Sequence, residues 1–331
     1  MKIAIVILNW NGKALLAQFL PSVIQFSSKA NIYVADNAST DDSIDFLRNA
    51  YPEVKIIQNK ENGGYAKGYN DALKDISEEI LILLNSDIEV SKDWLNPILD
   101  IFHKESKTAA VQPKILDFKN KSYFEYAGAA GGFIDKYGFP YCRGRIFETI
   151  EEDKGQYNDE VDIFWASGAC LAIKNAVFKE VGGFDEDFFA HQEEIDLCWR
   201  IKNLGYSIKY TGKSCVYHVG GATLDKMNPK KTFYNFRNSL FMLVKNLPKE
   251  KMRKIVLQRM VLDGIAGLKF LFQGDLRHFL AVLKAHSDFY VNFSKMTKKR
   301  IEKSSKFTYF DVKSIVFEYF ALKKTTYKKL I

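Results

Sequence analysis

The chain has 331 residues, of which 47% are hydrophobic and 27% charged. This composition is typical of a folded globular protein and argues against wholesale disorder. The net charge is +8, but residues 226–331 carry 24 lysines and arginines against 7 acidic residues, so that the preceding part is acidic. The four cysteines form no C-x-x-C pair, which argues against a zinc site or a disulfide framework and favours a reducing compartment.

Short apolar runs alternate with helix-like stretches in the first part of the chain. The run Ile3–Leu8 is too short for the hydrophobic region of a signal peptide and predicts a buried strand. Ser39 or Thr40 is expected to cap the helix near 41–50. Continuous apolar strands separated by helices predict an α/β fold with a mainly parallel sheet covered on both faces. The further strands are predicted at 32–35, 54–57 and 80–84, and the helices near 14–26, 41–50 and 66–75.

Polar residues follow each of these predicted strands: Asn9-Trp10-Asn11, Asp36-Asn37, Asn59 and Asn85-Ser86-Asp87. Ligands of open parallel sheets bind beyond the carboxyl ends of the strands. At any single strand these polar residues could simply form the turn that ends the strand. Four such strand ends together predict a ligand-binding edge of the sheet. A carboxylate such as Asp87 suits Mg²⁺ or Mn²⁺, which prefer oxygen ligands and share them with phosphates, and a helix cap is the alternative interpretation.

A pair of glycines, Gly63 and Gly64, follows Asn62 and precedes the predicted helix near 66–75. Glycine lets a phosphate approach the backbone closely, and a helix N-terminus attracts anions. No G-x-G-x-x-G fingerprint follows the first strand, which argues against a dinucleotide-dependent dehydrogenase.

The pattern is irregular over residues 114–160, where glycines and aromatics alternate, and we expect loops and short strands near an acceptor site. After this stretch an amphipathic helix is predicted at 192–204, ended by Gly205, followed by strands at 207–211 and 215–219. His218 lies in the last of these strands. A single histidine in an apolar strand is either structural or, if the fold places it beside Asp87, a metal ligand.

Three carboxylates, Glu193, Glu194 and Asp196, stand at the start of this predicted helix. Clustered carboxylates can raise one another's pKa and so provide a general base. Acidic residues also simply stabilise helix N-termini. The pattern by itself leaves both interpretations open.

Together these segments resemble the family 2 glycosyltransferases, which have the GT-A fold. They are most similar to the bacterial rhamnosyltransferase-like branch that builds surface polysaccharides. Each motif is loose, but the five occur in the family's order over about residues 1–221, and the combination is specific. The matching segments are 6–11, 34–41, 62–66, 85–87 and 193–198.

The resemblance implies roles for the residues of the first three segments. Asn9, Asn11 and Asp36 would contact the nucleoside, with Asp36 on the base. Asn62 and Gly64 would lie near the diphosphate of the donor.

The remaining segments would supply the metal site and the catalytic base. Asn85-Ser86-Asp87 matches the family's D-x-D region, with Asp87 on Mg²⁺ or Mn²⁺ and Asn85 or Ser86 near the ribose, although the usual first Asp is absent. His218 matches a second metal ligand of some relatives. Glu194 stands where the family's base, usually Asp, is found, and Asp196 is the other catalytic candidate.

The reaction implied is inverting transfer of a sugar from a UDP- or dTDP-sugar to a glycan or lipid-linked acceptor in surface polysaccharide biosynthesis of a bacterial cell envelope. A nucleotidyltransferase is an alternative. Such enzymes usually have a glycine- and lysine-rich loop after the first strand, and residues 9–13 are a poor match to it. A membrane-bound assembly protein with a degenerate site is another, because the D-x-D and base positions depart from the family.

Residues 226–331 are predicted to form a basic, mainly helical region after a catalytic domain at 1–225. The apolar and basic residues interleaved over 253–286 would either pack on the catalytic domain or lie on an anionic membrane surface. No apolar run approaches 18 residues, so we expect no spanning helix. A cytoplasmic protein, peripheral on the inner membrane, fits best, and no nucleic-acid recognition motif is present.

Overall fold

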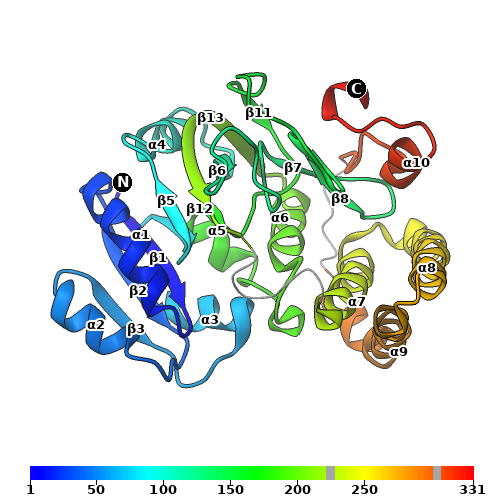
Figure 1. Ribbon diagram of the computed structural model, residues 1–331, viewed down its shortest axis with the longest axis horizontal. Helices are drawn as coiled ribbons and strands as arrows, with labels where there is room; N and C mark the ends of the chain where they lie inside the picture. The colour runs from blue at the N-terminus through cyan, green and yellow to red at the C-terminus, as the bar shows by residue number, and fades with distance from the viewer. Residues whose placement is uncertain (221–227, 301–306) are drawn as a thin grey trace.

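The computed structural model describes residues 1–220, 228–300 and 307–331, and Figure 1 shows its arrangement. Within these residues a nine-stranded sheet forms the centre. Its short strand β5 (Ile88–Val90) pairs with β13 (Ser207–His218). The other strands lie in the order β11 (Glu160–Asp162), β13 (Ser207–His218), β6 (Thr108–Asp117), β12 (Cys170–Lys174), β4 (Ile80–Asn85), β1 (Ile3–Asn9), β2 (Asn31–Asp36) and β3 (Lys55–Gln58).

The sheet is mixed, and the predicted fold class is confirmed in its first part. Strands β4, β1, β2 and β3 are parallel neighbours, whereas β12 runs antiparallel to both β4 and β6. The two strands predicted at 207–211 and 215–219 are one strand, β13. Its register against β6 shifts between Thr211 and Cys215, and such an irregularity bends a strand without ending its pairing.

Helices cover both faces of the sheet, as the continuous apolar strands predict. Along β1, Ala4 and Val6 belong to one core, and Ile5 and Ile7 to the core on the opposite face, because successive strand residues point to opposite sides. The first core is completed by α3 (Gly64–Leu73), α5 (Asn175–Glu180) and α6 (Glu193–Asn203), and the second by α1 (Lys13–Phe26), α2 (Ser43–Ala50) and α4 (Leu95–Lys104).

The predicted cap of α2 is wrong. The N-cap is Asp42, without a side-chain hydrogen bond. Ser39 and Thr40 instead bond to the loop after β1, where the Thr40 amide donates to Asn11 Oδ1 at 2.7 Å. These residues therefore serve the strand-end loop and not the helix.

The irregular segment 114–160 contains the short strands expected there. Four of them form a separate antiparallel sheet, in the order β10 (Thr149–Ile150), β9 (Arg145–Ile146), β8 (Pro140–Cys142) and β7 (Gly132–Ile134). The short helix α10 (Ile315–Phe320) packs on this sheet through Ile315, which forms one apolar cluster with Tyr141, Ile146 and the preceding residue Val312.

The C-terminal region is helical, as predicted, with α7 (Pro229–Asn246), α8 (Lys249–Phe272) and α9 (Leu276–Lys298) preceding α10. The predicted boundary near residue 225 lies outside the described residues. Helix α7 buries Leu240–Val244 in the same core as α3 and α6, so this region shares its core with the sheet. Among the described helices, none is both long and apolar enough to cross a bilayer.

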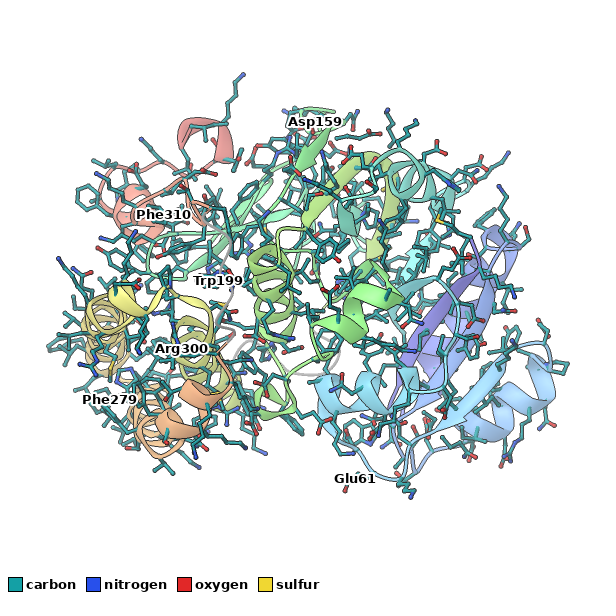
Figure 2. The ribbon with its side chains drawn as sticks, turned by 180° about the vertical axis from the view of Figure 1, so that it is seen from behind. Glu61, Asp159, Trp199, Phe279, Arg300 and Phe310 are labelled. Atoms are coloured by element: carbon teal, nitrogen blue, oxygen red, sulfur yellow. The ribbon has the colours of Figure 1, made fainter. Side chains whose placement is uncertain are left out.

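Two residues labelled in Figure 2, Trp199 and Arg300, tie the end of the chain to the rest. Trp199 of α6 is fully buried, with its ring 5.4 Å from that of Phe164 and 4.9 Å from that of Tyr309. The guanidinium of Arg300 donates to the carbonyls of Val244 and Leu247 at the end of α7, which satisfies acceptors that a helix end leaves unpaired.

Candidate functional site

The carboxyl ends of the parallel strands bring their polar residues together. Asn9 of β1 is in register with Asp36 of β2, and its Nδ2 donates to Asp36 Oδ1 at 3.0 Å and to Ser39 Oγ at 3.2 Å. Asp36 Oδ2 accepts from the amide of Ser39 at 2.9 Å. Asp36 is only 2% exposed, and each of its oxygens accepts one of these bonds.

The loop after β1 is fixed to the loop after β2. Asn11 has a left-handed backbone, with φ of 50°, and its amide donates to Ser39 Oγ at 2.8 Å. Asn9 Oδ1 is buried without a hydrogen-bond partner, and it faces the position that a side chain at Gly12 would occupy. The two loops thus form one rigid polar edge with a free acceptor.

The glycine pair before α3 lies against the loop that leads into α6. Asn62 Oδ1 accepts from the amide of Gly64 at 3.0 Å and from Asn37 Nδ2 at 2.9 Å. Gly64 has φ of 75°, and a Cβ there would lie 2.6 Å from the carbonyl oxygen of Phe189, so both conformation and space require glycine. The amide of Tyr65 donates to the same Phe189 carbonyl at 3.0 Å.

The structure brings Asp87 and His218 together. Strand β13 pairs with β5, which places His218 beside Ile88, and His218 Nε2 lies 3.1 Å from Asp87 Oδ1. Asn85 Nδ2 is 3.3 Å from the same ring nitrogen. Both Asp87 and His218 are 5% exposed, so this pair is almost shielded from solvent.

A third buried residue, Glu125, lies on the other side of the histidine ring. His218 Nδ1 lies 3.4 Å from Glu125 Oε2. Burial would lower the pKa of His218, but the charge of Glu125, together with the hydrogen bond to Asp87, raises it to about 10. Burial by itself would raise the pKa of Asp87. The hydrogen bond to His218 and the charge of His218 lower it below its usual value.

The pair of Asp87 and His218 fits a divalent cation once Nε2 of His218 has lost its proton, because a metal binds only the neutral imidazole and the raised pKa otherwise keeps the ring protonated. Two ligands at about 2.1 Å from an octahedral cation and at right angles to each other are about 3.0 Å apart, close to the separation observed here. A carboxylate and an imidazole are both acceptable to Mn²⁺. Across the described ranges no three His, Cys, Asp or Glu side chains gather as a metal site.

The first turn of α6 carries two carboxylates that each have one oxygen without a partner. Oε2 of Glu193 and Oε2 of Glu194 are each shielded from solvent and make no hydrogen bond. Burial raises the pKa of Glu194 to about 7, and burial together with the charge of Glu194 raises that of Glu193 well above its ordinary value. A carboxyl that titrates near neutral pH is suited to exchange a proton with a substrate.

Asp196, two residues on, lies in different surroundings. It is fully buried and accepts hydrogen bonds from Arg200 Nε at 2.9 Å, Lys245 Nζ at 2.7 Å and Asn246 Nδ2 at 2.8 Å. The predicted contact between Asp196 and Arg200 is therefore present. Burial would raise the pKa of Asp196, but the charges of Lys245 and Arg200 lower it, and the carboxylate holds α6 against α7.

The loop that leads into α6 has an unusual backbone that α7 holds in place. Phe189, His191 and Gln192 have φ between 59° and 69°, which is uncommon for residues other than glycine and costs conformational energy. Asn238 Nδ2 of α7 lies 2.7 to 3.0 Å from the carbonyl oxygens of Phe188, Ala190 and His191. Gln192 Nε2 also donates to Ser239 Oγ at 2.8 Å.

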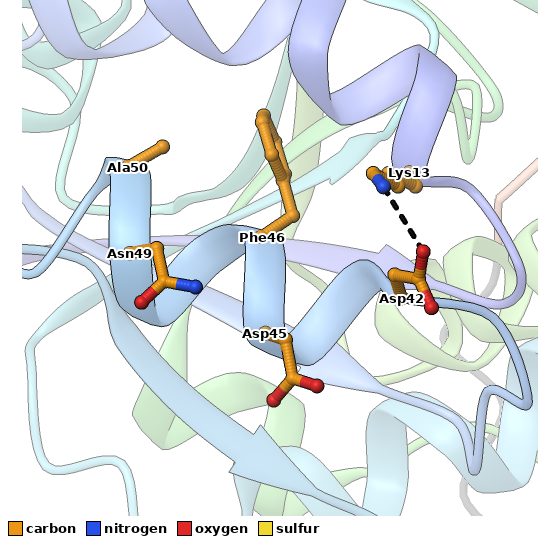
Figure 3. A pocket seen from close by; sticks show the side chains of 6 residues that line it. All are labelled: Lys13, Asp42, Asp45, Phe46, Asn49 and Ala50. Atoms are coloured by element: carbon orange, nitrogen blue, oxygen red, sulfur yellow. Dashed lines mark hydrogen bonds and ion pairs between the residues drawn. The ribbon is translucent and has the colours of Figure 1, made fainter.

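A surface hollow of about 410 Å³ lies elsewhere, between α1 and α2 (Figure 3). Lys13 and Asp42 face each other across it, 3.1 Å apart. The lining contains none of the residues that the sequence selects: it consists of Lys13, Asp42, Asp45, Phe46, Asn49 and Ala50. The candidate site is therefore the polar edge of the sheet and not this hollow.

Comparison with known proteins agrees with this geometry. A family profile described as Glycosyl transferase family 2 matches residues 4–182, more than half of the chain. The chain belongs to glycosyl transferase family 2. The matched segment contains the loops after β1, β2 and β4 and the glycine pair before α3, and it ends before the carboxylates of α6.

Relatives in this family include enzymes that act on lipid-linked sugars. The N-acetylglucosaminyl-diphospho-decaprenol L-rhamnosyltransferase of Mycobacterium tuberculosis is 24% identical over 218 residues, which cover 61% of this chain and 71% of the relative. This relative agrees with the rhamnosyltransferase-like branch named from the sequence.

Solved structures of the same architecture were determined with nucleotide ligands. GalNAc-T7 with UDP, GalNAc and Mn²⁺ superposes with a TM-score of 0.57 at 18% identity, over 74% of this chain and 48% of that one. TarS 1–349 of S. aureus in complex with UDP-GlcNAc superposes with a TM-score of 0.55 at 14% identity, over 94% of this chain and 99% of that one. The chain thus spans about half the length of GalNAc-T7, and at these identities the likeness establishes the GT-A fold alone.

Two residues of the candidate site escaped the sequence analysis. Glu125 lies in the irregular segment 114–160 and touches His218 only because the backbone of Glu125 pairs with that of Ile115 in β6. Asn238 lies in the basic helical region and belongs to no motif. In neither case does a local sequence signal exist, since the role of each residue depends on a contact with a distant segment.

Proposed function

We propose that the protein is an inverting, metal-dependent glycosyltransferase that uses a UDP- or dTDP-sugar. The observation that carries this proposal is the combination of two features. The pair of Asp87 and His218 lies at the edge of the sheet, and the carboxylate of Glu194, which has no hydrogen-bond partner on Oε2, lies in the first turn of α6. The pair of Asp87 and His218, through its cation, would hold the leaving diphosphate. Glu194 would take up the proton of the acceptor hydroxyl.

The nucleoside would bind between the loops after β1 and β2. Each oxygen of Asp36 accepts one hydrogen bond in the structure, and a carboxylate oxygen has two lone pairs, so Asp36 can still accept from the imide N–H of uracil or thymine. The free Oδ1 of Asn9 and the loop at Asn11 would complete this pocket. Cytosine and adenine lack a ring N–H at this position, and the N1–H of guanine lies farther from the glycosidic bond than the imide N–H of uracil, which favours UDP or dTDP.

The ribose and the diphosphate would lie further along the same edge. Asn85 and Ser86 follow β4 beside the metal pair and would contact the ribose. Asn62 and Gly64 stand at the start of α3, where the helix dipole and the lack of a side chain favour the diphosphate.

Asp87 and His218 would hold Mg²⁺ or Mn²⁺. When bound, the cation supplies Lewis-acid stabilisation of the negative charge that develops on the departing nucleoside diphosphate. Glu125 keeps the histidine ring in the orientation that presents Nε2 toward Asp87. The fold neighbour GalNAc-T7 was solved with Mn²⁺, which supports the choice of a divalent cation.

Glu194 would act as the general base. The acceptor hydroxyl loses its proton to Glu194 as its oxygen forms a bond to the anomeric carbon, and the bond from this carbon to the diphosphate oxygen breaks on the opposite side. One such displacement inverts the anomeric configuration. Of the two catalytic candidates, Asp196 is engaged by Arg200 and Lys245 and would position α6 instead of accepting a proton.

The acceptor would be a glycan or a lipid-linked sugar used for a surface polysaccharide. The name of the mycobacterial relative, which acts on a diphospho-decaprenol-linked sugar, supports a lipid-linked acceptor here. We place the catalytic domain at 1–225 and the basic helical region at 226–331, with the protein peripheral on the cytoplasmic face of the inner membrane. Helix α7 of that region also supports the catalytic loop before α6.

A donor panel with Mn²⁺, read by nucleotide release, tests the proposal. Slow release of UDP or dTDP from one nucleotide sugar, abolished by EDTA, is the expected result. Release of pyrophosphate would indicate a nucleotidyltransferase, and no turnover with any donor would indicate a degenerate site. Equal calorimetric affinities for GDP and UDP would contradict the role of Asp36.

A further inference from the structure

Helices α8 and α9 expose a continuous row of large apolar side chains. On α8 the residues recur every three or four positions, which places them on one face of the helix, and α9 repeats the pattern. Each of these side chains is between 47% and 86% exposed. We call this set the hairpin face: Leu257, Val261, Ile265, Leu268 and Phe272 on α8, and Leu276, Leu280, Leu283 and Tyr290 on α9.

The hairpin face is not required for packing within the protein. The opposite sides of both helices are buried, through Met252, Ile255 and Val256 on α8 and Ala285 and Phe289 on α9. Figure 1 shows α8 and α9 at the end of the molecule far from α1 and α2, and Figure 2 shows the same end from behind, where Phe279 is labelled. A contiguous apolar surface of this size on a folded protein marks an interaction site.

Basic residues accompany the hairpin face. Lys269, Arg277 and Lys284 each follow a residue of the face by one position and are exposed, which puts their charges along its flank. Between residues 251 and 287 the chain has two acidic residues. Asp263 is buried and paired with Arg259 at 2.7 Å, and Asp275 caps the N-terminus of α9.

We propose that the hairpin face inserts into one leaflet of an anionic bilayer. Apolar side chains with lysine and arginine beside them are the pattern of a helix that lies in the interface, since the apolar groups reach the acyl chains and the cations meet the headgroups. The inference rests on the proposed function in its choice of a membrane as partner, because a lipid-linked acceptor is held in the bilayer.

A second copy of the chain is a poorer occupant of this surface. Two hairpin faces packed together would also bring the lysines and arginines of both copies close to one another, and like charges that meet across an interface oppose association. An anionic lipid surface supplies the opposite charge and the apolar phase at once.

Insertion differs from attraction by charge alone in its response to salt. Contacts between exposed charges and lipid headgroups weaken as salt shortens the screening length, whereas burial of apolar surface does not depend on that screening. Membrane binding through the hairpin face therefore keeps a salt-resistant part.

The test uses the full chain with extruded vesicles of phosphatidylcholine containing about one third phosphatidylglycerol, a content that sets the surface potential. Leu268→Asp with Phe272→Asp places two carboxylates in the centre of the hairpin face. Ala17→Asp with Gln18→Asp adds the same charge on exposed positions of α1, at the other end of the molecule. Sedimentation gives the bound fraction, far-UV circular dichroism shows that each variant is folded, and nucleotide release with Mn²⁺ tests the proposed function separately.

We expect the pair at 268 and 272 to bind vesicles at least tenfold more weakly than the wild type, and the pair on α1 to bind within twofold of it. If the wild type released no nucleotide but still bound vesicles, the proposed function would be refuted and the membrane inference would stand. Failure of the function and failure of the inference are therefore distinguishable. Equal vesicle binding by the 268/272 pair and the wild type would overturn the inference. A wild-type dimer that this pair dissociates while vesicle binding persists would also overturn it, in favour of a second copy.

A second variant keeps the inference testable if the paired substitutions unfold the chain. Phe272→Trp puts a fluorophore in the hairpin face, and lipids brominated along the acyl chain quench only tryptophan that reaches them. The wild type, whose Trp10 is 51% exposed, gives the baseline. Quenching well above this baseline that persists in about 1 M salt, where the screening length is about 3 Å, is expected. Quenching at the baseline level would contradict insertion.

Discussion

Helix α6 carries acidic side chains in two kinds of surroundings within its first turn. Glu193 and Glu194 each have a shielded oxygen without a partner, and burial raises the pKa of both. Asp196 is more deeply buried, yet Lys245 and Arg200 lower its pKa. The difference comes from α7 and from the helix's own next turn, which supply cations to one side only. The paired carboxylate of Asp196 stabilises the packing of α6. The carboxylates of Glu193 and Glu194, which have no cation beside them among the described residues, can exchange a proton.

The comparison predicts opposite phenotypes for two conservative substitutions, and the first has the largest effect expected in this protein. Glu194→Gln removes the proton acceptor but keeps the shape, so kcat should fall by about 10²–10⁴-fold, with little change in donor affinity. Asp196→Asn leaves Arg200 without its carboxylate partner, while Lys245 keeps Asp185 at 2.6 Å, and it should lower the free energy of unfolding by up to about 3–5 kcal/mol.

Steady-state kinetics and chemical denaturation of the two variants separate these effects. Glu194→Asp is the matched control, because it keeps the charge but shortens the reach, and its kcat should lie between those of the wild type and Glu194→Gln. If Asp196→Asn removed turnover in a fully folded protein while Glu194→Gln kept it, the base would be Asp196.

Glu125 extends the comparison to the edge of the sheet, because it is a buried carboxylate that acts through another residue. Glu125→Gln should lower the affinity for Mn²⁺ by about 10–100-fold, since residues that orient a metal-binding histidine typically contribute this much. The measurement is a calorimetric titration of Mn²⁺ in the presence of UDP. An unchanged Mn²⁺ affinity would show that His218 needs no such support or does not bind the metal.

The contact of Asn238 with the loop before α6 should matter for stability and turnover together. Asn238→Ala leaves carbonyls of this loop without a donor and should reduce the free energy of unfolding by about 1–3 kcal/mol. It should also lower kcat, because Glu194 follows this loop directly. Asn292→Ala is the control, since among the described residues Asn292 Nδ2 donates to the carbonyl of Asp288 in its own helix. A normal kcat in a destabilised Asn238→Ala would limit its role to folding.

The last of these predictions is a dependence of kcat and of stability on pH. The pKa of Glu194 is raised from 4.5 to about 7, so kcat should rise with pH up to about 7 and change by about tenfold per unit below it. The folded state binds this proton more tightly than the unfolded state, so stability is full below about 4.5 and is lost as pH rises through about 7. Besides burial, the charge of Glu194 raises the pKa of Tyr65 and Cys142, which stay neutral in this range.

Urea unfolding of Glu194→Gln and of the wild type across pH 4–8 tests the predicted dependence of stability on pH. Measurement of kcat of the wild type over the same range tests the predicted dependence of turnover. The variant should be more stable than the wild type at pH 8 and equal to it near pH 4, because only the wild type must bury a charge at the higher pH. Parallel curves for the two proteins would contradict the raised pKa of Glu194.

Much of the first part of the fold could be predicted because its signals are local. The strands β1 to β4 are apolar runs that end in polar residues, and parallel pairing places these ends side by side whatever the loops do. The cap of α2 was wrong because Ser39 and Thr40 bond to the loop at Asn11, a contact between loops that the helix pattern does not contain.

The remainder of the site depends on contacts between distant segments. Nothing in the sequence around Glu125 or Asn238 shows that one will touch His218 and the other the loop before α6. The amphipathic pattern of residues 253–286 predicts helices, but it does not distinguish an apolar face that is buried from one that is exposed. Arg259, assigned to the basic pattern, proved to be buried against Asp263, while Leu268 and Phe272 are exposed.

The most direct test of the central claim is calorimetric binding of UDP with and without Mn²⁺, because the account assigns nucleotide binding to the sheet edge and proton transfer to α6. Wild type and Glu194→Gln should bind UDP with equal affinity when Mn²⁺ is present. Asp87→Ala, which removes one of the two proposed metal ligands and leaves the core unchanged, should lose the Mn²⁺-dependent part of this binding. UDP binding by the wild type that is unaffected by EDTA, or full Mn²⁺-dependent binding by Asp87→Ala, would contradict the account.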